Sequence, residues 1–289
     1  MKKNRSTSSG FRAFFAVIWR NPLSRIGFII LLVFLLMAIF GPLFIPTLKS
    51  NYAARLQPPS AGHWLGTDMA GKDVGLQLIL GSRDVLLVAA YAASFAILFA
   101  CVIGIVSGLR GGMVDEALML FTNVVLTTPS FPMTMILSMV IRTTNPLVFG
   151  LLLSLWSWAG LAKAIRSQVL NLKHREFIEA SRIMGISQFN IILHDVVPNI
   201  VSYIAVNFIS IMKNSITASV GLMILGLAPY QGNHWGIMIN VAISQTGALL
   251  GSGSMTYFLA PVTCLMLFQL GSYFFATGLD EALNPRLRS

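Results

Sequence analysis

The strongest constraint on the fold is a set of long apolar segments separated by shorter polar ones. Six segments run for about 20 residues or more with few charges inside them, namely 27–46, 86–108, 117–141, 146–165, 199–225 and 257–278. As helices, each is long enough to cross a hydrocarbon core of roughly 30 Å at about 1.5 Å per residue. The sequence therefore predicts an all-α integral membrane protein with six transmembrane helices.

The composition favours this fold over a soluble one. Only 10% of the residues are charged and 55% are hydrophobic, whereas soluble domains carry about 25% charged residues. A soluble core would also need apolar runs of roughly 10–14 residues, shorter than several of these. The chain is predicted to divide into an N-terminal segment, residues 1–26, and a transmembrane domain, residues 27–289.

Residues 1–26 are basic and lead into the first apolar segment. A cleaved signal peptide has a shorter apolar region and a small-residue cleavage site, so we expect an uncleaved first span. Aromatic and aliphatic residues recur at helical spacing at positions 11, 14, 15, 18 and 19. This pattern predicts a short interfacial helix, and the alternative is a poorly ordered basic tail.

Lysine and arginine are divided unevenly between the two sides of the predicted bundle. With the N-terminus inside, the inner segments hold fourteen of them: Lys2, Lys3, Arg5, Arg12, Arg20, Arg25, Arg110, Lys163, Arg166, Lys173, Arg175, Arg182, Arg286 and Arg288. The outer segments hold four, Lys49, Arg55, Lys72 and Arg142, and Arg83 and Lys213 lie at or within spans. Because cytoplasmic loops carry the excess of these residues, both termini and the loop 166–198 are predicted to be cytoplasmic.

Two outer segments are expected. Residues 47–82 are rich in proline and glycine, which indicates turns, and Asp68 and Asp73 within them are expected to act as turn and cap residues or to contact a binding protein. Residues 226–256 are too interrupted to span, so short re-entrant or interfacial helices are predicted there. On the inner side, the glycines of residues 108–112 predict a tight turn.

The polar stretch 173–198 is unusual between two apolar segments and suggests that a soluble partner docks there. Residues 173–184 favour a helix, with Glu179 spaced to pair with Arg175 and with Arg182. Ser181 and Gly185 lie four residues apart, so they could form a face with little side-chain bulk. Alternatively, Gly185 simply ends the helix.

This stretch resembles the cytoplasmic signature of ABC importer permeases, which reads Glu-Ala-Ala, three residues, Gly, nine residues, Ile-x-Leu-Pro. Glu179, Ala180, Gly185 and Pro198 match it. Ser181 replaces the second alanine, and Val197 replaces the leucine. Asp195 stands where the pattern has isoleucine, which is the larger departure.

Further segments resemble the second permease subunit of the dipeptide and oligopeptide (and nickel) importers. HWLGTDMAGKDV, residues 63–74, is similar to the outer-loop pattern LGTDxxGRDV, with Lys72 in place of arginine. The run from Trp158 to Phe177 and the segment GLDEALNPRLR, residues 278–288, fit the same subfamily. The resemblance holds from about residue 20 to the end of the chain.

The resemblance implies a permease in the cytoplasmic (inner) membrane of a prokaryote, in contact with membrane lipid. A homologous second permease would complete the translocation path, two ATPase subunits would bind ATP and Mg, and an extracytoplasmic binding protein would deliver the substrate. The residues expected to contact an ATPase are Glu179, Ala180, Ser181, Arg182 and Gly185.

The sequence gives no reason to expect catalysis or a cofactor in this chain. It has no GxxxxGK[ST] phosphate loop, so ATP hydrolysis is expected in separate subunits. Cys101 and Cys264 lie in apolar runs, and the four histidines lack the spacing of metal ligands. No basic patch with interleaved aromatic residues is present, so nucleic acid is not expected as a partner despite the net charge of +10.

Two polar interruptions of the spans are candidates for the translocation path. Lys213 lies deep in the fifth predicted span, followed by Asn214, Ser215 and Thr217. A charge at that depth usually faces protein or a water-filled cavity, so Lys213 either lines the path or makes a structural pair. Pro129 and Pro132 interrupt the third span and predict a kink, beside the path or purely structural.

The substrate is left open by the sequence. The subfamily resemblance favours di- and oligopeptides, and the alternatives are oligosaccharides and nickel or other metal chelates. Alternatives from other classes are a secondary transporter or channel that works without an ATPase, and a membrane scaffold without transport.

Overall fold

A computed structural model of the chain describes residues 18–45, 48–228, 230, 233–246 and 255–283. Within these ranges the regular elements are helices, with one isolated antiparallel bridge between Thr67 and Asp73. The interfacial helix predicted around residues 11–19 falls almost entirely outside the described ranges. The all-α class predicted from the sequence is confirmed.

The helices follow one another along the chain, and most of the connections between them are short. They are α2 (Pro22–Phe44), α3 (Val74–Arg110), α4 (Gly112–Thr127), α5 (Ser130–Val140), α6 (Pro146–Lys173), α7 (Glu176–Ile183), α8 (Gln188–Ile191), α9 (Val197–Ile224), α10 (Trp235–Gln245) and α11 (Met255–Leu283). A 3₁₀ turn (Tyr52–Ala54) precedes α3, and a π-helical turn (Ile192–Val196) joins α8 to α9. Five helices in the described ranges are long and apolar enough to cross a membrane, taking Gln188–Ile224 as one.

The third predicted span, 117–141, is broken into two helices. α4 and α5 are bent by 81° relative to each other, and counting them as one span brings the total to six. Thr128, between them, has an extended backbone, which is the conformation favoured for the residue before a proline. Pro129 then supplies no N–H to continue the helix, so the predicted interruption is found as a sharp bend.

Side-chain caps set where several helices begin. Asn21 accepts a hydrogen bond from the backbone N–H of Leu23 (3.0 Å), and Asp73 accepts one from that of Leu76 (2.9 Å). Since Asp73 caps α3, residues 74–82 are helical, although the sequence assigns them to an outer connection. At the other side, α6 runs on to Lys173 and takes in the first residues of the predicted loop 166–198.

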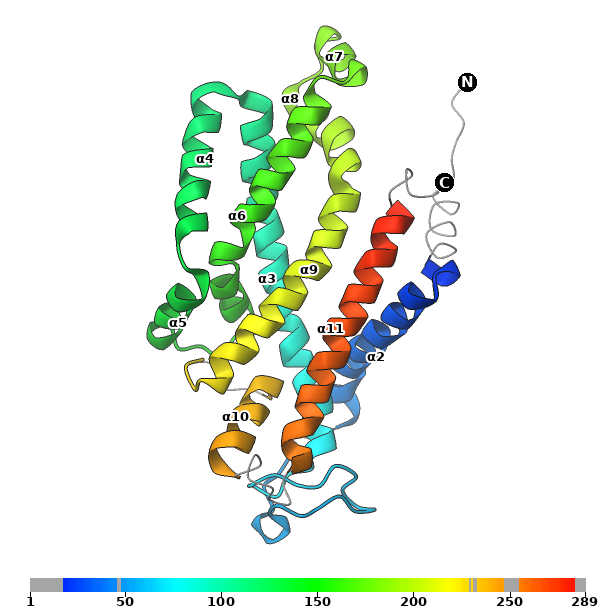
Figure 1. Cartoon of the computed structure of the whole chain (residues 1–289), viewed down its shortest axis with the longest axis vertical. Helices are drawn as coiled ribbons and strands as arrows, with labels where there is room; N and C mark the ends of the chain where they lie inside the picture. The colour runs from blue at the N-terminus through cyan, green and yellow to red at the C-terminus, as the bar shows by residue number, and fades with distance from the viewer. Residues whose placement is uncertain (1–17, 46–47, 229, 231–232, 247–254, 284–289) are drawn as a thin grey trace.

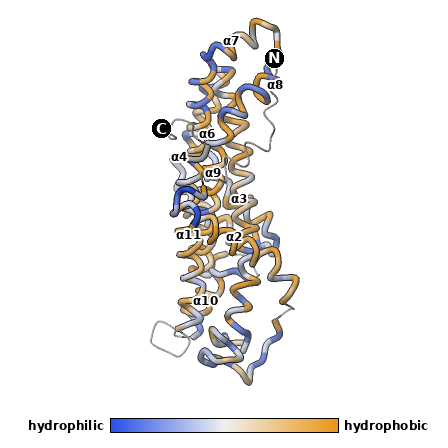
Figure 2. The backbone as a smooth tube through the Cα atoms, turned by 90° about the vertical axis from the view of Figure 1, so that its right-hand side faces the viewer, coloured by the Kyte–Doolittle hydropathy of each residue, from blue (hydrophilic) through white to orange (hydrophobic). Residues whose placement is uncertain are grey.

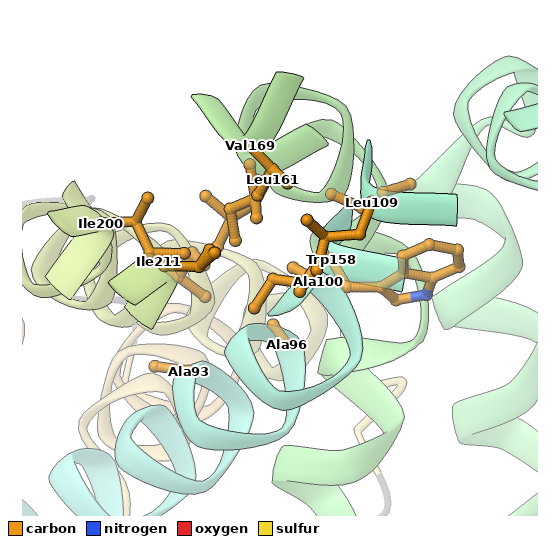
Figure 3. Packing of buried hydrophobic residues seen from close by; sticks show 14 of the residues in the cluster. Ala93, Ala96, Ala100, Leu109, Trp158, Leu161, Val169, Ile200 and Ile211 are labelled. Carbon is orange, nitrogen blue, oxygen red and sulfur yellow. The ribbon is translucent and has the colours of Figure 1, made fainter. Parts of the chain in front are cut away.

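α3 and α6 pack against each other more extensively than any other pair of described helices. Ala93, Ala96 and Ala100 line the side of α3 that faces the larger residues of α6 and α9 (Figure 3). At Gly104 the two helices approach so closely that a Cβ would lie 2.6 Å from the carbonyl oxygen of Ala162. Small residues therefore let the helix backbones pack tightly, as is common in membranes.

The long helices are arranged side by side, with small elements at either end. α4 and α6 lie on one side, α2 and α11 on the other, and α9 runs between them (Figure 1). One end carries α7 and α8 and is called here the α7 end. The other end carries α10 and residues 48–73 and is called the α10 end. Figure 2 shows mostly hydrophobic residues along the long helices and a mixture of hydrophilic and hydrophobic ones on α7.

Glycines close the turn between α3 and α4. Gly111 and Gly112 both have positive φ, at +67° and +54°. Only glycine adopts this left-handed region at little cost. The tight turn predicted for residues 108–112 is confirmed.

Candidate functional site

α7 turns one face toward the bundle. Ile178 is fully buried in an apolar cluster that includes Ile165 and Val169 of α6 and Ile200 of α9. Ser181, one helical turn further on, is only 7% exposed. These two residues, three apart, share a face that is fixed against the rest of the protein.

Several large apolar side chains on α7 and in the chain just beyond it, as far as α8, are exposed. Ile183 is 87% exposed, Met184 69% and Phe189 67%, and Phe177 and Ile186 are also exposed. We call these five residues the α7 patch. Glu176 and Glu179 lie in the first turn of α7, where negative charge interacts favourably with the helix dipole. Large apolar side chains exposed together within a short segment commonly mark a contact with another protein.

The structure corrects the predicted small face of Ser181 and Gly185. α7 ends at Ile183, and Gly185 lies beyond it with φ +73°. The N–H of Ile186 donates to the carbonyl oxygen of Ser181 (3.1 Å), which is the capping pattern of a helix that ends on a left-handed glycine. Gly185 therefore ends the helix, as the alternative reading had it, and Ser181 faces inward instead of outward.

The charge pair predicted between Arg175 and Glu179 is not found among the ion pairs of the described ranges. Arg175 precedes α7 and its carbonyl oxygen accepts hydrogen bonds from the N–H groups of Ile178 and Glu179. Glu179 and Ala180 are exposed on the outer side of α7. The side chain of Arg182 lies outside the part of the chain that the structure describes.

The inward face of α7 meets the root of α9 through a hydrogen bond. The hydroxyl of Ser181 donates to Oδ2 of Asp195 at 3.0 Å. Asp195 lies in the π-helical turn that joins α8 to α9. Beyond it, α9 continues to Ile224 and carries the polar residues that the sequence singles out at 213–217.

These polar residues point in two directions. Gln269 of α11 donates from Nε2 to Oγ1 of Thr217 (2.7 Å) and to the carbonyl oxygen of Lys213 (3.3 Å). Asn214 and Ser215 are turned away from these contacts, toward α5 and α6. Successive residues of an α-helix are about 100° apart, so one run of polar residues cannot share a face.

Asn214 and Ser215 line a cavity of about 250 Å³ between α5, α6 and α9. The other lining residues are Ser130, Phe131, Thr134, Leu153, Trp156, Ser157 and Ala218. Ser130 and Thr134 reach the cavity because the bend at Pro129 redirects α5. Lys213, Thr217, Pro129 and Pro132 are not among the lining residues.

The cavity offers neutral hydrogen-bonding groups. Its hydrogen-bonding side chains are four hydroxyls, one amide and the indole N–H of Trp156, and the described lining carries no ionisable group. Thr134 donates to the carbonyl oxygen of Ser130 at 2.7 Å, so its oxygen remains available as an acceptor. Such a lining suits a polar, uncharged group better than an isolated ion. Thr134, Trp156 and Ser157 were not predicted from the sequence.

Other acidic residues of interest have structural partners. Asp68 accepts hydrogen bonds from the N–H groups of Ala70 and Lys72, both at 2.8 Å, and from Nε2 of Gln77 at 2.9 Å. Asp73 caps α3 and contacts Nδ1 of His63 at 2.9 Å. These contacts are those of turn and cap residues, as predicted.

No group of three or more metal-ligating side chains occurs in the described ranges. His234 lies at the start of α10, where its Nδ1 accepts a hydrogen bond from the N–H of Gly236 (3.1 Å). Its burial lowers the pKa of the imidazole to about 3, so the ring is neutral at physiological pH. This histidine is a buried helix cap.

Comparison with known proteins places these features in context. Residues 100–289 match the family described as binding-protein-dependent transport system inner membrane component. Residues 9–59 match the N-terminal TM domain of oligopeptide transport permease C.

Individual relatives are similar over most of their length. The oligopeptide transport system permease protein OppC of Bacillus subtilis is 31% identical over 271 residues, covering 93% of this chain and 87% of the relative. The dipeptide transport system permease protein DppC of the same organism is 31% identical over 274 residues, covering 93% and 83%. DppC of Alkalihalophilus pseudofirmus is 30% identical over 286 residues, covering 97% and 91%.

Proposed function

The chain belongs to the family of binding-protein-dependent transport system inner membrane components, and on this basis we propose that it forms half of the translocation path of an ATP-driven importer of di- and oligopeptides. The relatives named above are oligopeptide and dipeptide transport permeases, and they are matched along most of the chain. One observation supports the transport role most strongly. The continuous helix Gln188–Ile224 has the exposed apolar α7 patch at one end and lines the polar cavity further along its length.

The chemistry of the cavity supports a peptide substrate. A peptide backbone presents neutral N–H and C=O groups whatever its side chains are. The hydroxyls and the Asn214 amide can pair with both kinds of group, and Trp156 adds an apolar surface. Because hydroxyls also suit sugar rings, an oligosaccharide substrate is the second candidate, and metal chelates are the third.

The α7 end is proposed to be the cytoplasmic contact for the ATPase. The excess of lysine and arginine in the segments on this side is the signal that supports the orientation, with both termini inside. The α7 patch would be covered by a groove of an ATPase subunit. Glu179 and Ala180 are also exposed on α7, and we propose that they contact the same ATPase subunit.

The remaining partners follow from the same role. A second, homologous permease would complete the path, and two ATPase subunits would bind ATP and Mg. An extracytoplasmic binding protein would present the substrate at the α10 end. Hydrolysis of ATP would then take place in separate chains and not in this one.

Reconstitution tests the proposal directly. The complex is purified through an affinity tag on this chain and placed in lipid vesicles with ATP on the side of the ATPases and the binding protein on the other. Uptake of labelled tri-alanine that requires both ATP and the binding protein is the expected result. Uptake by this chain alone without ATP, or uptake that a maltotriose excess abolishes while unlabelled peptide does not, would contradict it.

A further inference from the structure

Two residues that depart from the ABC permease pattern are bonded to each other. The pattern has alanine where this chain has Ser181 and isoleucine where it has Asp195. In the structure the Ser181 hydroxyl donates to Oδ2 of Asp195 at 3.0 Å, across 14 residues of sequence. Neither an alanine nor an isoleucine side chain could make this bond, so each departure supplies the partner that the other needs.

Asp195 is held firmly by the helix on which it stands. It lies in the π-helical turn Ile192–Val196, and such turns leave backbone carbonyls without their usual i+4 partner. Nδ2 of Asn199 donates to the carbonyl oxygen of Asp195 at 2.6 Å. The backbone at Asp195 is thus tied into the first turn of α9, while its carboxylate reaches α7.

The other attachments of α7 are less directional. Ile178 packs in an apolar cluster, and apolar contacts hold a separation without fixing a direction. The link back to α6 is the short turn at His174 and Arg175, outside both helices. A hydrogen bond to an ionised carboxylate is both stronger and more directional than these contacts.

We propose that Ser181 and Asp195 are positioning residues through which movement of α7 is passed to α9. α9 then carries the movement to the cavity, since Asn214 lies 19 residues beyond Asp195 on the same continuous helix, or roughly 30 Å at about 1.5 Å per residue. The proposal rests on the proposed function, because it supposes that an ATPase moves α7.

Four variants separate this role from a simple contribution to folding or docking. Ser181→Ala and Asp195→Ala each remove one partner, and the double variant removes both. Asp195→Asn keeps an oxygen that accepts a hydrogen bond from Ser181. In the reconstituted complex we measure the amount of ATPase retained, the basal rate of ATP hydrolysis, and tri-alanine taken up per ATP hydrolysed.

Ser181→Ala and Asp195→Ala are each expected to keep the ATPase and the basal rate of hydrolysis. Uptake per ATP is expected to fall about tenfold in both, the size expected for losing one hydrogen bond to an ionised group. The double variant is expected to be no worse than either single one, because both remove the same contact. Asp195→Asn is expected to stay within about threefold of wild type, since a neutral acceptor retains part of the bond.

Three results would overturn the inference. One is unchanged uptake per ATP in Ser181→Ala. Another is losses that multiply in the double variant. The third is a fall in uptake that merely follows loss of the ATPase, because that shows a docking role. If the wild-type complex takes up no tri-alanine, the proposed function fails instead. A nitroxide label pair between α7 and the second half of α9 then decides the inference: the distance between them should change on ATP binding in wild type, and an equal change in Ser181→Ala would contradict it.

Discussion

Arg166 of α6 makes a bidentate contact with Asp115 of α4. Its Nε donates to Oδ1 at 2.6 Å and its Nη2 donates to Oδ2 at 2.5 Å. The hydroxyl of Ser107 on α3 also donates to Oδ1. The carboxylate therefore ties together the three helices that surround the turn at Gly111. Bidentate arginine–carboxylate pairs are among the stronger polar contacts in proteins.

Asp115→Asn is expected to lower the free energy of unfolding by about 1–3 kcal/mol, because it leaves a partly buried guanidinium without its charge partner. Thermal unfolding of the purified chain in detergent measures the change. Glu116→Gln is the matched control, since Glu116 is the neighbouring acid and is exposed. Equal unfolding temperatures for Asp115→Asn and Glu116→Gln would contradict a stabilising role for the pair.

Close packing of α3 against α6 predicts a contrast between two glycines. Gly104→Ala places a Cβ 2.6 Å from the Ala162 carbonyl oxygen, whereas a Cβ at Gly160 of α6 meets nothing within 4 Å. We expect Gly104→Ala to cost about 1–3 kcal/mol through overpacking. Gly160→Ala should be neutral or stabilising by up to about 1 kcal/mol. The same unfolding assay applies, and a reversed order would refute the packing of the two helices described above.

His234 predicts a dependence of stability on pH. Its folded pKa of about 3 lies below the ordinary value of 6.5, so the unfolded chain binds a proton that the folded chain does not. Stability should therefore fall as the pH drops from about 6.5 toward 3, by about 1.4 kcal/mol for each pH unit.

The variant His234→Asn isolates this contribution. Asparagine can still cap α10 but does not titrate. The unfolding free energy of the variant should therefore depend less steeply on pH between pH 6 and pH 4, by the amount that His234 contributes in the wild type. The wild-type and variant slopes are compared in one buffer series. Parallel slopes would mean that His234 is not buried in its neutral form.

The cavity predicts which residue of the 213–217 run matters for transport. Asn214→Leu removes the only amide among the described lining residues and should reduce uptake of tri-alanine about tenfold, as expected for the loss of one hydrogen bond to the substrate. Lys213→Met and Thr217→Val alter the other face of α9 and should leave uptake within about twofold. If Lys213→Met abolishes uptake in an intact complex while Asn214→Leu does not, the path follows the face toward α11.

Parts of the architecture could be predicted from the sequence because they depend on local pattern. The length of the apolar segments predicts the long helices, and the glycines at 111 and 112 predict the turn between α3 and α4. The turn and cap roles of Asp68 and Asp73 follow from the residues next to them in the sequence. The break before Pro129 was also predictable, because proline removes a helical N–H wherever it stands.

Orientation between distant residues could not be predicted in the same way. The sequence predicts Ser181 on a small, outward face of α7. Its hydrogen-bond partner, Asp195, lies 14 positions further along and in another helical element, so the sequence pattern does not reveal the contact. The cavity was missed for a similar reason. Ser157 and Asn214 come together only through the packing of α6 against α9, although helical periodicity alone already separates Asn214 from Lys213.

The central claim is that the α7 patch is the surface through which an ATPase drives this chain, and the amount of ATPase that co-purifies with it tests this claim most directly. Met184→Glu puts a charge into the patch, whereas Met113→Glu changes a methionine outside it, at the start of α4, that is even more exposed (86% against 69%). We predict that the amount of ATPase that co-purifies with Met184→Glu is lower than with wild type by about tenfold or more, because an unpaired charge is costly in an apolar contact. Met113→Glu should co-purify with the wild-type amount. Equal retention by Met184→Glu and wild type would contradict the account.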